Sequence, residues 1–314
     1  MSHAPGGGTT HTIGKPHFDD AGVAHYPVQS IYQRSRNADG SPAYTDLRVI
    51  EPDKGVGGTT RLLYVLPVQP GTPRSMAGQW ATDYGDGIAA MRDLDVANRC
   101  DLVVVEPDFN AVEAPGLYET GPAPWYGDSP ASAAIRQESY IVSAVVPAVD
   151  SLYPAARRER LLLGYSKSGW GAINLLLRHP DLFEAAAAWD APLMMRSISP
   201  PHYADEDIVF GRDNDYFTRE YRLDTHLSAA GALKGRNRIW LGINPATPIP
   251  PPGRRYAGDF PRQTEDFAAA LDVAGIPYTL RRQSGPRKHS WGPTSVGGRD
   301  VYWEVDAIEF LAKR

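Results

Sequence analysis

The sequence contains few of the residues that build disulfide scaffolds or metal sites. Its 314 residues include a single cysteine, Cys100, which excludes an intrachain disulfide and a cysteine-rich metal site. Cys100 precedes an apolar run at residues 102–105, so we interpret it as a buried thiol rather than a nucleophile. The histidine and acidic residues form no compact ligand set, which disfavours a metal hydrolase. We therefore expect no cofactor and no metal.

Long apolar segments and blocks of one charge are also missing. No run approaches the length needed to span a bilayer, and the first residues lack the apolar stretch of a secretory signal. Lys and Arg are scattered over a chain of net charge −5, which argues against nucleic-acid binding. We expect no membrane or nucleic-acid partner, and a cytoplasmic location, or secretion if a signal peptide was removed. The oligomeric state is left open.

Predicted strands and predicted helices alternate along the chain, which predicts an α/β fold. Hydrophobic residues make up 42% and charged residues 22%, as expected for a folded core. The predicted buried strands are residues 61–66, 102–105, 161–163, 185–189, 238–241 and 278–280. The predicted helices are residues 86–97, 131–152, 172–177, 263–273 and 302–311. This alternation predicts a mostly parallel sheet with helices on both faces.

The first part of the chain has a different pattern. Residues 26–32 and 44–50 alternate polar and apolar side chains around turn residues at 37–40, which predicts an antiparallel hairpin. Residues 1–14, rich in Gly, Thr and His, are expected to form a flexible tail. Residues 15–314 are expected to form one domain, in which the polar stretch at about 193–235 suggests a small lid.

One stretch has the pattern of a nucleophile elbow. Ser166 lies in GYSKSG, residues 164–169, between a predicted strand and a predicted helix. That context exposes a catalytic serine on a sharp turn at the edge of a sheet. Gly164 permits the reversal, whereas Ser168 stands where a second glycine is usual. An ordinary helix N-cap is the alternative, and the context favours the elbow.

A serine nucleophile needs a base, and His289 is the candidate. It lies in the loop between the last predicted strand and the closing helix. An imidazole has a pKa near neutrality, so it can accept the serine proton and later release it. His179 follows the elbow helix and is interpreted as a residue that interacts with the helix dipole.

These motifs resemble the α/β-hydrolase superfamily. GYSKSG at residues 164–169, HPDLF at 179–183 and KHSW at 288–291 are most similar to its esterase D and enterochelin-esterase-like branch, which includes feruloyl and acetyl esterases. The resemblance covers residues 60–314. It implies ester hydrolysis through an acyl-enzyme, without a cofactor.

The catalytic acid of this fold usually follows the penultimate strand. Here that strand is followed by a loop whose first carboxylate is the distant Asp259. Asp190 directly follows the preceding strand, and the ends of adjacent parallel strands meet at one rim. We prefer Asp190, then Asp259, then Glu265. A helix-capping role is the alternative for Asp190.

Backbone N–H groups near the elbow are candidates for an oxyanion hole. The N–H of Lys167 is one donor, and Val68 or Gln69 supplies the other, because the flanking prolines have no N–H. Trp125, Tyr126 and Trp291 are candidate substrate-binding residues, with a packed core as the alternative.

The predicted function is that of a serine carboxylic-ester hydrolase with a Ser166–His289–Asp190 triad. Its expected substrate is a small-molecule or carbohydrate-linked ester. The alternatives are a non-catalytic binding protein on the same scaffold and an acyltransferase that uses the same triad.

Overall fold

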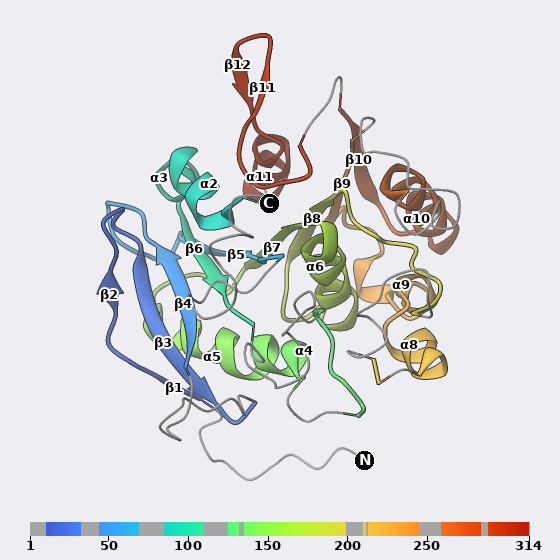
Figure 1. Cartoon of the computed structure of the whole chain (residues 1–314), viewed down its shortest axis with the longest axis horizontal. Helices are drawn as coiled ribbons and strands as arrows, with labels where there is room; N and C mark the ends of the chain where they lie inside the picture. The colour runs from blue at the N-terminus through green and yellow to red at the C-terminus, as the bar shows by residue number, and fades with distance from the viewer. Residues whose placement is uncertain are drawn as a thin grey trace.

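A mixed sheet forms the centre of the molecule (Figure 1). The computed structural model describes residues 11–32, 44–68, 85–109, 125–131, 135–198, 210–211, 213–244, 259–283 and 288–313. Among these residues the sheet has ten strands in the order β1-β3-β4-β6-β5-β7-β8-β9-β10, and β2 pairs with β3. From β6 to β10 every neighbouring pair is parallel, which confirms the predicted fold class.

The N-terminal strands form the antiparallel side of the sheet. β3 (Ala24–Ser30) and β4 (Thr45–Ile50) pair antiparallel and alternate buried with half-buried residues, which confirms the predicted hairpin. β1 (His11–Ile13) and β2 (His17–Phe18) both pair with β3. The tail predicted over residues 1–14 is therefore wrong at its end, because the backbone of β3 offers hydrogen bonds to residues 11–13. Residues 1–10 lie outside the described residues.

The parallel strands are buried on both faces. They are β5 (Arg61–Val65), β6 (Leu102–Pro107), β7 (Arg160–Tyr165), β8 (Ala185–Trp189), β9 (Ile239–Ile243) and β10 (Tyr278–Arg282). Successive residues of β7 belong to different cores: Leu162 packs in the larger core, and Leu161 and Leu163 pack in the smaller one. This alternation gives each face of the sheet its own apolar layer.

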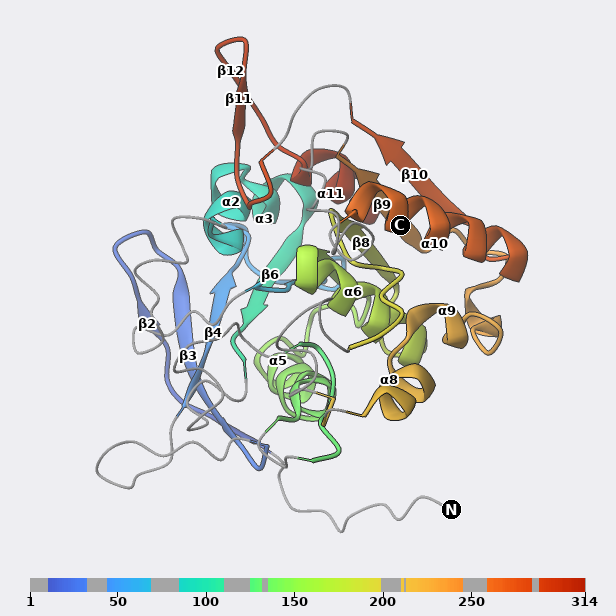
Figure 2. The ribbon, with the colours of Figure 1, turned by 45° about the vertical axis from the view of Figure 1, so that its right-hand side comes forward.

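Helices cover both faces. α4 (Gln137–Tyr140), α5 (Val146–Leu152), α6 (Ser166–Arg178) and α10 (Phe260–Ala274) contribute to the larger core. α2 (Gly87–Asp93), α3 (Val96–Cys100) and α11 (Glu304–Ala312) contribute to the smaller one. A separate hairpin of β11 (Thr294–Val296) and β12 (Arg299–Val301) extends away from the sheet (Figures 1 and 2).

The helix predicted over residues 131–152 begins later and is interrupted. It starts at Gln137, and the π-helical turn η1 (Ile141–Val145) joins α4 to α5. Pro147 lies in the first turn of α5 and has no N–H for the helical ladder, which accounts for a widened turn before it.

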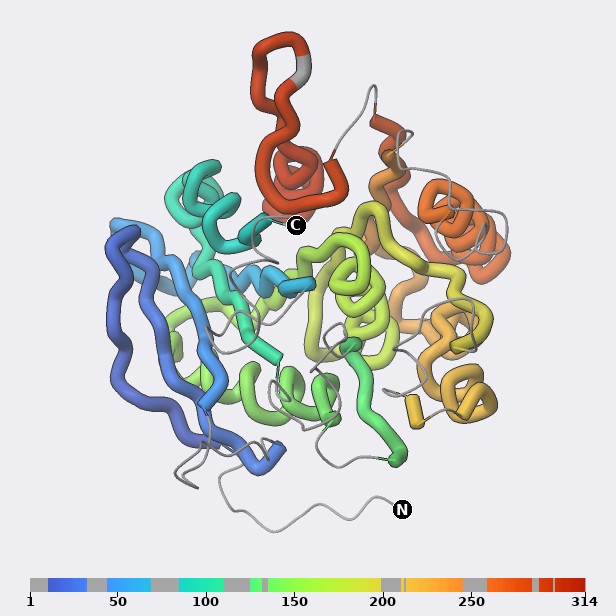
Figure 3. The backbone as a smooth tube through the Cα atoms, viewed as in Figure 1, coloured from blue at the N-terminus to red at the C-terminus, as the bar shows by residue number. Residues whose placement is uncertain are grey.

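Short helices follow β8. They are α8 (Asn214–Glu220), α9 (Leu223–His226) and the 3₁₀ turn η2 (Gly231–Leu233). α9 packs against α6, and the tube in Figure 3 follows this part of the chain in yellow and orange. Phe217 and Leu223 are buried in the larger core, so this part packs on the domain. A lid at about 193–235 stays a prediction. No helix in the described ranges is long and apolar enough to cross a membrane.

Candidate active site

Ser166 occupies a strained turn between β7 and α6. Its φ is +52°, a left-handed conformation that residues with a side chain rarely adopt and that is often found at functional sites. A Cβ on Gly164 would lie 2.4 Å from the carbonyl oxygen of Ser168, so only glycine fits two residues before the serine. The local geometry is that of a strand–turn–helix with a serine at the turn.

Ser168, which replaces the usual glycine, is part of the turn. It is fully buried, its hydroxyl accepts a hydrogen bond from Tyr165 N–H at 3.1 Å, and it donates to Tyr165 C=O at 2.8 Å. The hydroxyl thus satisfies both backbone groups of the residue before Ser166. Gly169 leaves room for the residues that follow β8, because a Cβ at position 169 would lie 2.9 Å from Ala191 Cβ.

Asp190 ends the adjacent strand in the same way. Tyr165 of β7 is in register with Trp189 of β8, so Ser166 and Asp190 are the residues that follow matched positions on parallel neighbours. Asp190 also has a positive φ, +46°, and is 1% exposed. Two strained residues at one edge of the sheet therefore carry a hydroxyl and a carboxylate.

His289 reaches this edge from the segment after β10. Its Nδ1 lies 3.2 Å from Asp190 Oδ2, a contact that leaves Nε2 for another partner. Its ring lies edge-on to Tyr165, with centroids 5.2 Å apart, and stacks on Phe260 at 5.4 Å. Tyr165 directly precedes Ser166, so the imidazole contacts the residue next to the predicted nucleophile.

The other two candidate acids are engaged elsewhere. Asp259 is the N-cap of α10 and accepts a hydrogen bond from Arg262 N–H at 3.1 Å. Glu265 forms an ion pair with Arg282 on β10. Of the three carboxylates considered, the structure brings Asp190 to His289.

The predicted oxyanion donors lie on two elements beside the turn. Lys167 is the second residue of α6, in the first turn, where backbone N–H groups point out of the helix end. Its ammonium lies 5.3 Å from the centroid of Phe109. Val68 is buried just beyond β5, whereas Gln69 lies outside the described residues.

Comparison with known proteins supports an esterase assignment. Residues 103–243, which include Ser166 and Asp190, match the Esterase family model. This match and the solved structures described below support an esterase-like α/β-hydrolase family. No curated protein matches its sequence.

Solved structures with the same fold cover nearly the whole chain. S-formylglutathione hydrolase from Agrobacterium tumefaciens is 17% identical, with a TM-score of 0.65 over 96% of this chain and 99% of its own. The S-formylglutathione hydrolase FrmB from Staphylococcus aureus is 15% identical, with a TM-score of 0.61 over 92% of this chain and 99% of its own. A ferulic acid esterase is 17% identical, with a TM-score of 0.56 over 98% of both chains.

Aromatic packing and a buried glutamate fix the segment that carries His289. Trp291 is 5% exposed and packs edge-on against Tyr165 and Trp189, at centroid distances of 5.2 and 5.1 Å. Gly292 N–H donates to Glu304 Oε1 at 2.7 Å. Burial raises the pKa of Glu304 to about 7. Trp291, predicted to bind substrate, thus anchors the segment that carries His289.

Trp125 and Tyr126 also lie in the interior. Trp125 is 5% exposed and packs edge-on against Trp170 at 5.2 Å. Tyr126 is fully buried, and its hydroxyl donates to Pro67 C=O at 2.5 Å. A Cβ on Gly171 would lie 2.3 Å from the Tyr126 ring, so α6 is shaped to accept this side chain. Tyr126 therefore connects the helix behind Ser166 to the segment that carries Val68, a role that its place in an aromatic loop does not reveal.

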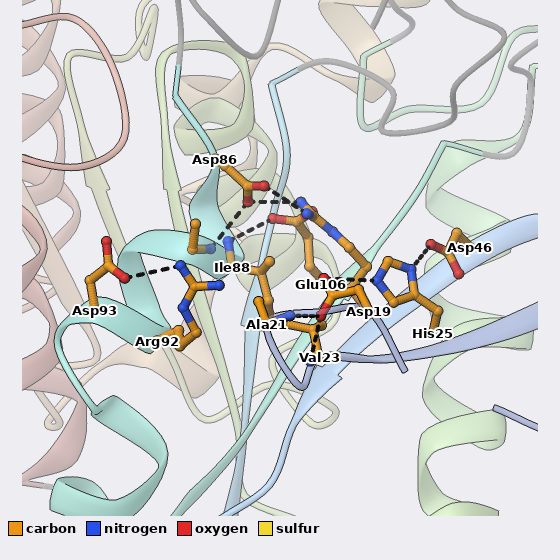
Figure 4. Close-up of polar contacts among 12 residues, drawn as sticks. Asp19, Ala21, Val23, His25, Asp46, Asp86, Ile88, Arg92, Asp93 and Glu106 are labelled. Atoms are coloured by element: carbon orange, nitrogen blue, oxygen red, sulfur yellow. Dashed lines mark hydrogen bonds and ion pairs between the residues drawn. The ribbon is translucent and has the colours of Figure 1, made fainter. Parts of the chain in front are cut away.

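An ion network stabilises the other side of the site. Glu106, at the end of β6, and Asp86, the N-cap of α2, both pair with Arg48 of β4. Glu106 also accepts a hydrogen bond from Ile88 N–H at 3.2 Å. Figure 4 shows Asp86, Ile88 and Glu106 close together at the start of α2. Burial raises the pKa of Glu106 to about 7, although Arg48 opposes this shift. Glu106 ends a strand at the ligand-binding edge, yet its contacts join β4, β6 and α2.

The described residues contain no group of three histidine, cysteine or acidic side chains placed to hold a metal ion.

Proposed function

We propose that this esterase hydrolyses carboxylic esters through an acyl-enzyme on Ser166. The observation that carries the proposal is the contact of His289 Nδ1 with Asp190 Oδ2 at 3.2 Å, beside the strained Ser166 turn. The proposed substrate is a small-molecule or carbohydrate-linked ester. The names of similar structures, S-formylglutathione hydrolase and ferulic acid esterase, belong to enzymes that cleave acyl bonds.

In the proposed first step, His289 Nε2 takes the proton of Ser166 while the serine oxygen bonds to the ester carbonyl carbon. Asp190 holds the imidazole with Nδ1–H toward itself and stabilises the imidazolium that forms. Collapse of the tetrahedral intermediate breaks the carbon–oxygen bond to the alcohol, which leaves with the proton from His289. Water then repeats the sequence on the acyl-enzyme and releases the carboxylic acid.

The developing oxyanion needs donors that are in place before the reaction. The N–H of Lys167 and that of Val68 or Gln69 are the proposed pair, each worth about 3 kcal/mol of transition-state stabilisation. The positive end of α6 adds to the same effect.

The Asp190–His289 contact also supports catalysis over a non-catalytic binding role. The binding-protein alternative arose because no carboxylate follows the penultimate strand. Asp190 supplies that carboxylate from β8 instead. An acyltransferase uses the same first step and differs only if an acceptor alcohol outcompetes water.

The direct test is Ser166→Ala with p-nitrophenyl acetate as the substrate. We expect turnover to fall by at least about 10³-fold with an unchanged circular dichroism spectrum, as for loss of a triad nucleophile. Ser295→Ala, on the exposed β11–β12 hairpin, is the matched control and should keep full activity. A fluorophosphonate should label the wild type and the control but not Ser166→Ala. Undiminished turnover in Ser166→Ala would remove this serine from the mechanism.

A further inference from the structure

Asn244 lies at the carboxyl end of β9, next to the acid. β8 and β9 are parallel neighbours, and Asn244 directly follows the last residue of β9 as Asp190 directly follows the last residue of β8. Its side chain is buried, with the residue 1% exposed. Asn244 Nδ2 donates to Asp190 Oδ2 at 3.1 Å. This is the same oxygen that contacts His289 Nδ1 at 3.2 Å.

Asn244 contacts the acid from a position where an acid would itself be expected. It occupies the position after the penultimate strand, where the resemblance leads one to expect the catalytic acid. The chain has a neutral donor there and places the carboxylate one strand earlier, on a residue with a positive φ. A buried hydrogen bond to an ionised carboxylate is stronger than one between neutral groups, and it restricts the carboxylate's rotation.

We propose that Asn244 is a positioning residue for the reaction, which acts by holding Asp190 oriented toward His289. The inference rests on the function proposed above. Asn244 lies at hydrogen-bonding distance from the acid, and its effect on the nucleophile passes through Asp190 and His289. Its loss therefore changes the rate of the chemical step more than the binding of substrate.

Asn244→Leu tests this role, because leucine has a similar size and no donor. We expect kcat for p-nitrophenyl acetate to fall by at least about tenfold while KM stays within about twofold. Asn237→Leu is the matched control, since Asn237 precedes the other end of β9 and its Nδ2 donates to Thr279 Oγ1 at 2.8 Å. The control should keep the wild-type kcat whatever its stability.

A double-mutant cycle separates positioning from a general packing effect. Asp190→Asn alone should reduce kcat by about 10³- to 10⁴-fold, because it removes the group that fixes the imidazole tautomer. Adding Asn244→Leu to Asp190→Asn should then cost less than about twofold, because the partner through which Asn244 acts is gone. An equal loss in both backgrounds would overturn the proposal, as would a wild-type kcat in Asn244→Leu.

Asn244→Asp gives a second readout if the leucine variant folds poorly. Two facing carboxylates bind one proton between them, so this variant keeps the hydrogen bond until that proton leaves. We expect near-native kcat at low pH and a fall at alkaline pH that the wild type does not show. A pH profile identical to that of the wild type would overturn the proposal. Ser166→Ala serves as the reference: if it retains turnover, the proposed function itself fails, whereas a failure confined to the Asn244 variants affects only this inference.

Discussion

Replacing Glu304 with glutamine should change how the stability of the protein depends on pH. Glu304 is fully buried at the start of α11, and burial raises the pKa of its carboxyl from 4.5 to about 7. Holding the carboxyl at that pKa makes its ionised form about 3 kcal/mol less favourable in the folded state than in the unfolded one. Between pH 4.5 and 7 the folded state binds the proton and the unfolded state does not. The contribution of this group is therefore fully present below about pH 4.5 and is lost as the pH rises through 7.

Glutamine cannot ionise, and its Oε1 can still accept from Gly292 N–H. We expect the difference in unfolding free energy, Glu304→Gln minus wild type, to rise by about 3 kcal/mol from pH 4.5 to pH 8. Urea unfolding followed by tryptophan fluorescence at several pH values measures it. Glu309→Gln on the same helix is the control, because Glu309 is an exposed residue paired with Lys313 at 3.3 Å, and its difference should stay flat. A flat difference for Glu304→Gln as well would refute the assigned cause of the shift.

Two further substitutions test contacts beside the site. Tyr126→Phe removes the donor to Pro67 C=O and should lower the unfolding free energy by about 1–2 kcal/mol and kcat severalfold. Tyr140→Phe is the control, because it also loses a buried hydroxyl, one bonded to Thr45, and it should show the stability loss without the kcat loss. Equal kcat in the two variants would contradict the role of Tyr126 in holding the segment that carries Val68. Arg48→Met leaves Glu106 buried without its cation and should cost about 3–5 kcal/mol in urea unfolding, more at pH 8 than at pH 6. Adding Glu106→Gln should recover most of that loss, and no recovery would contradict the ion-network interpretation.

The strands and the positions of the proposed triad residues were predictable because they depend on short-range patterns. Short apolar runs bounded by turn residues mark strands that are buried on both faces. Even the alanine-rich run at residues 185–189 forms β8, because α6 packs closely on it. Ser166, Asp190 and His289 each follow a predicted strand in the sequence. Because these strands are parallel, their carboxyl ends lie at one edge of the sheet. The contact of Asp190 with His289 follows from this rule.

Other features depend on contacts that the local sequence does not encode. Trp125, Tyr126 and Trp291 lie in aperiodic loops, where nothing in the pattern distinguishes a core side chain from the wall of a pocket. Arg48 and Glu106 are 58 residues apart and meet only because β4 and β6 are neighbours in the sheet. The donor role of Asn244 likewise needs the register of β8 against β9.

The three proposed catalytic groups are attached to the fold in unequal ways. Ser166 and Asp190 lie at the ends of two adjoining central strands, whereas His289 belongs to a later segment secured by Trp291 and Glu304. A refolding chain that has formed its sheet but has not yet packed the segment that carries His289 would therefore be compact and inactive. The onset of hydrolysis during refolding thus reports when the His289 segment packs. The spectroscopic signal reports the formation of the sheet separately.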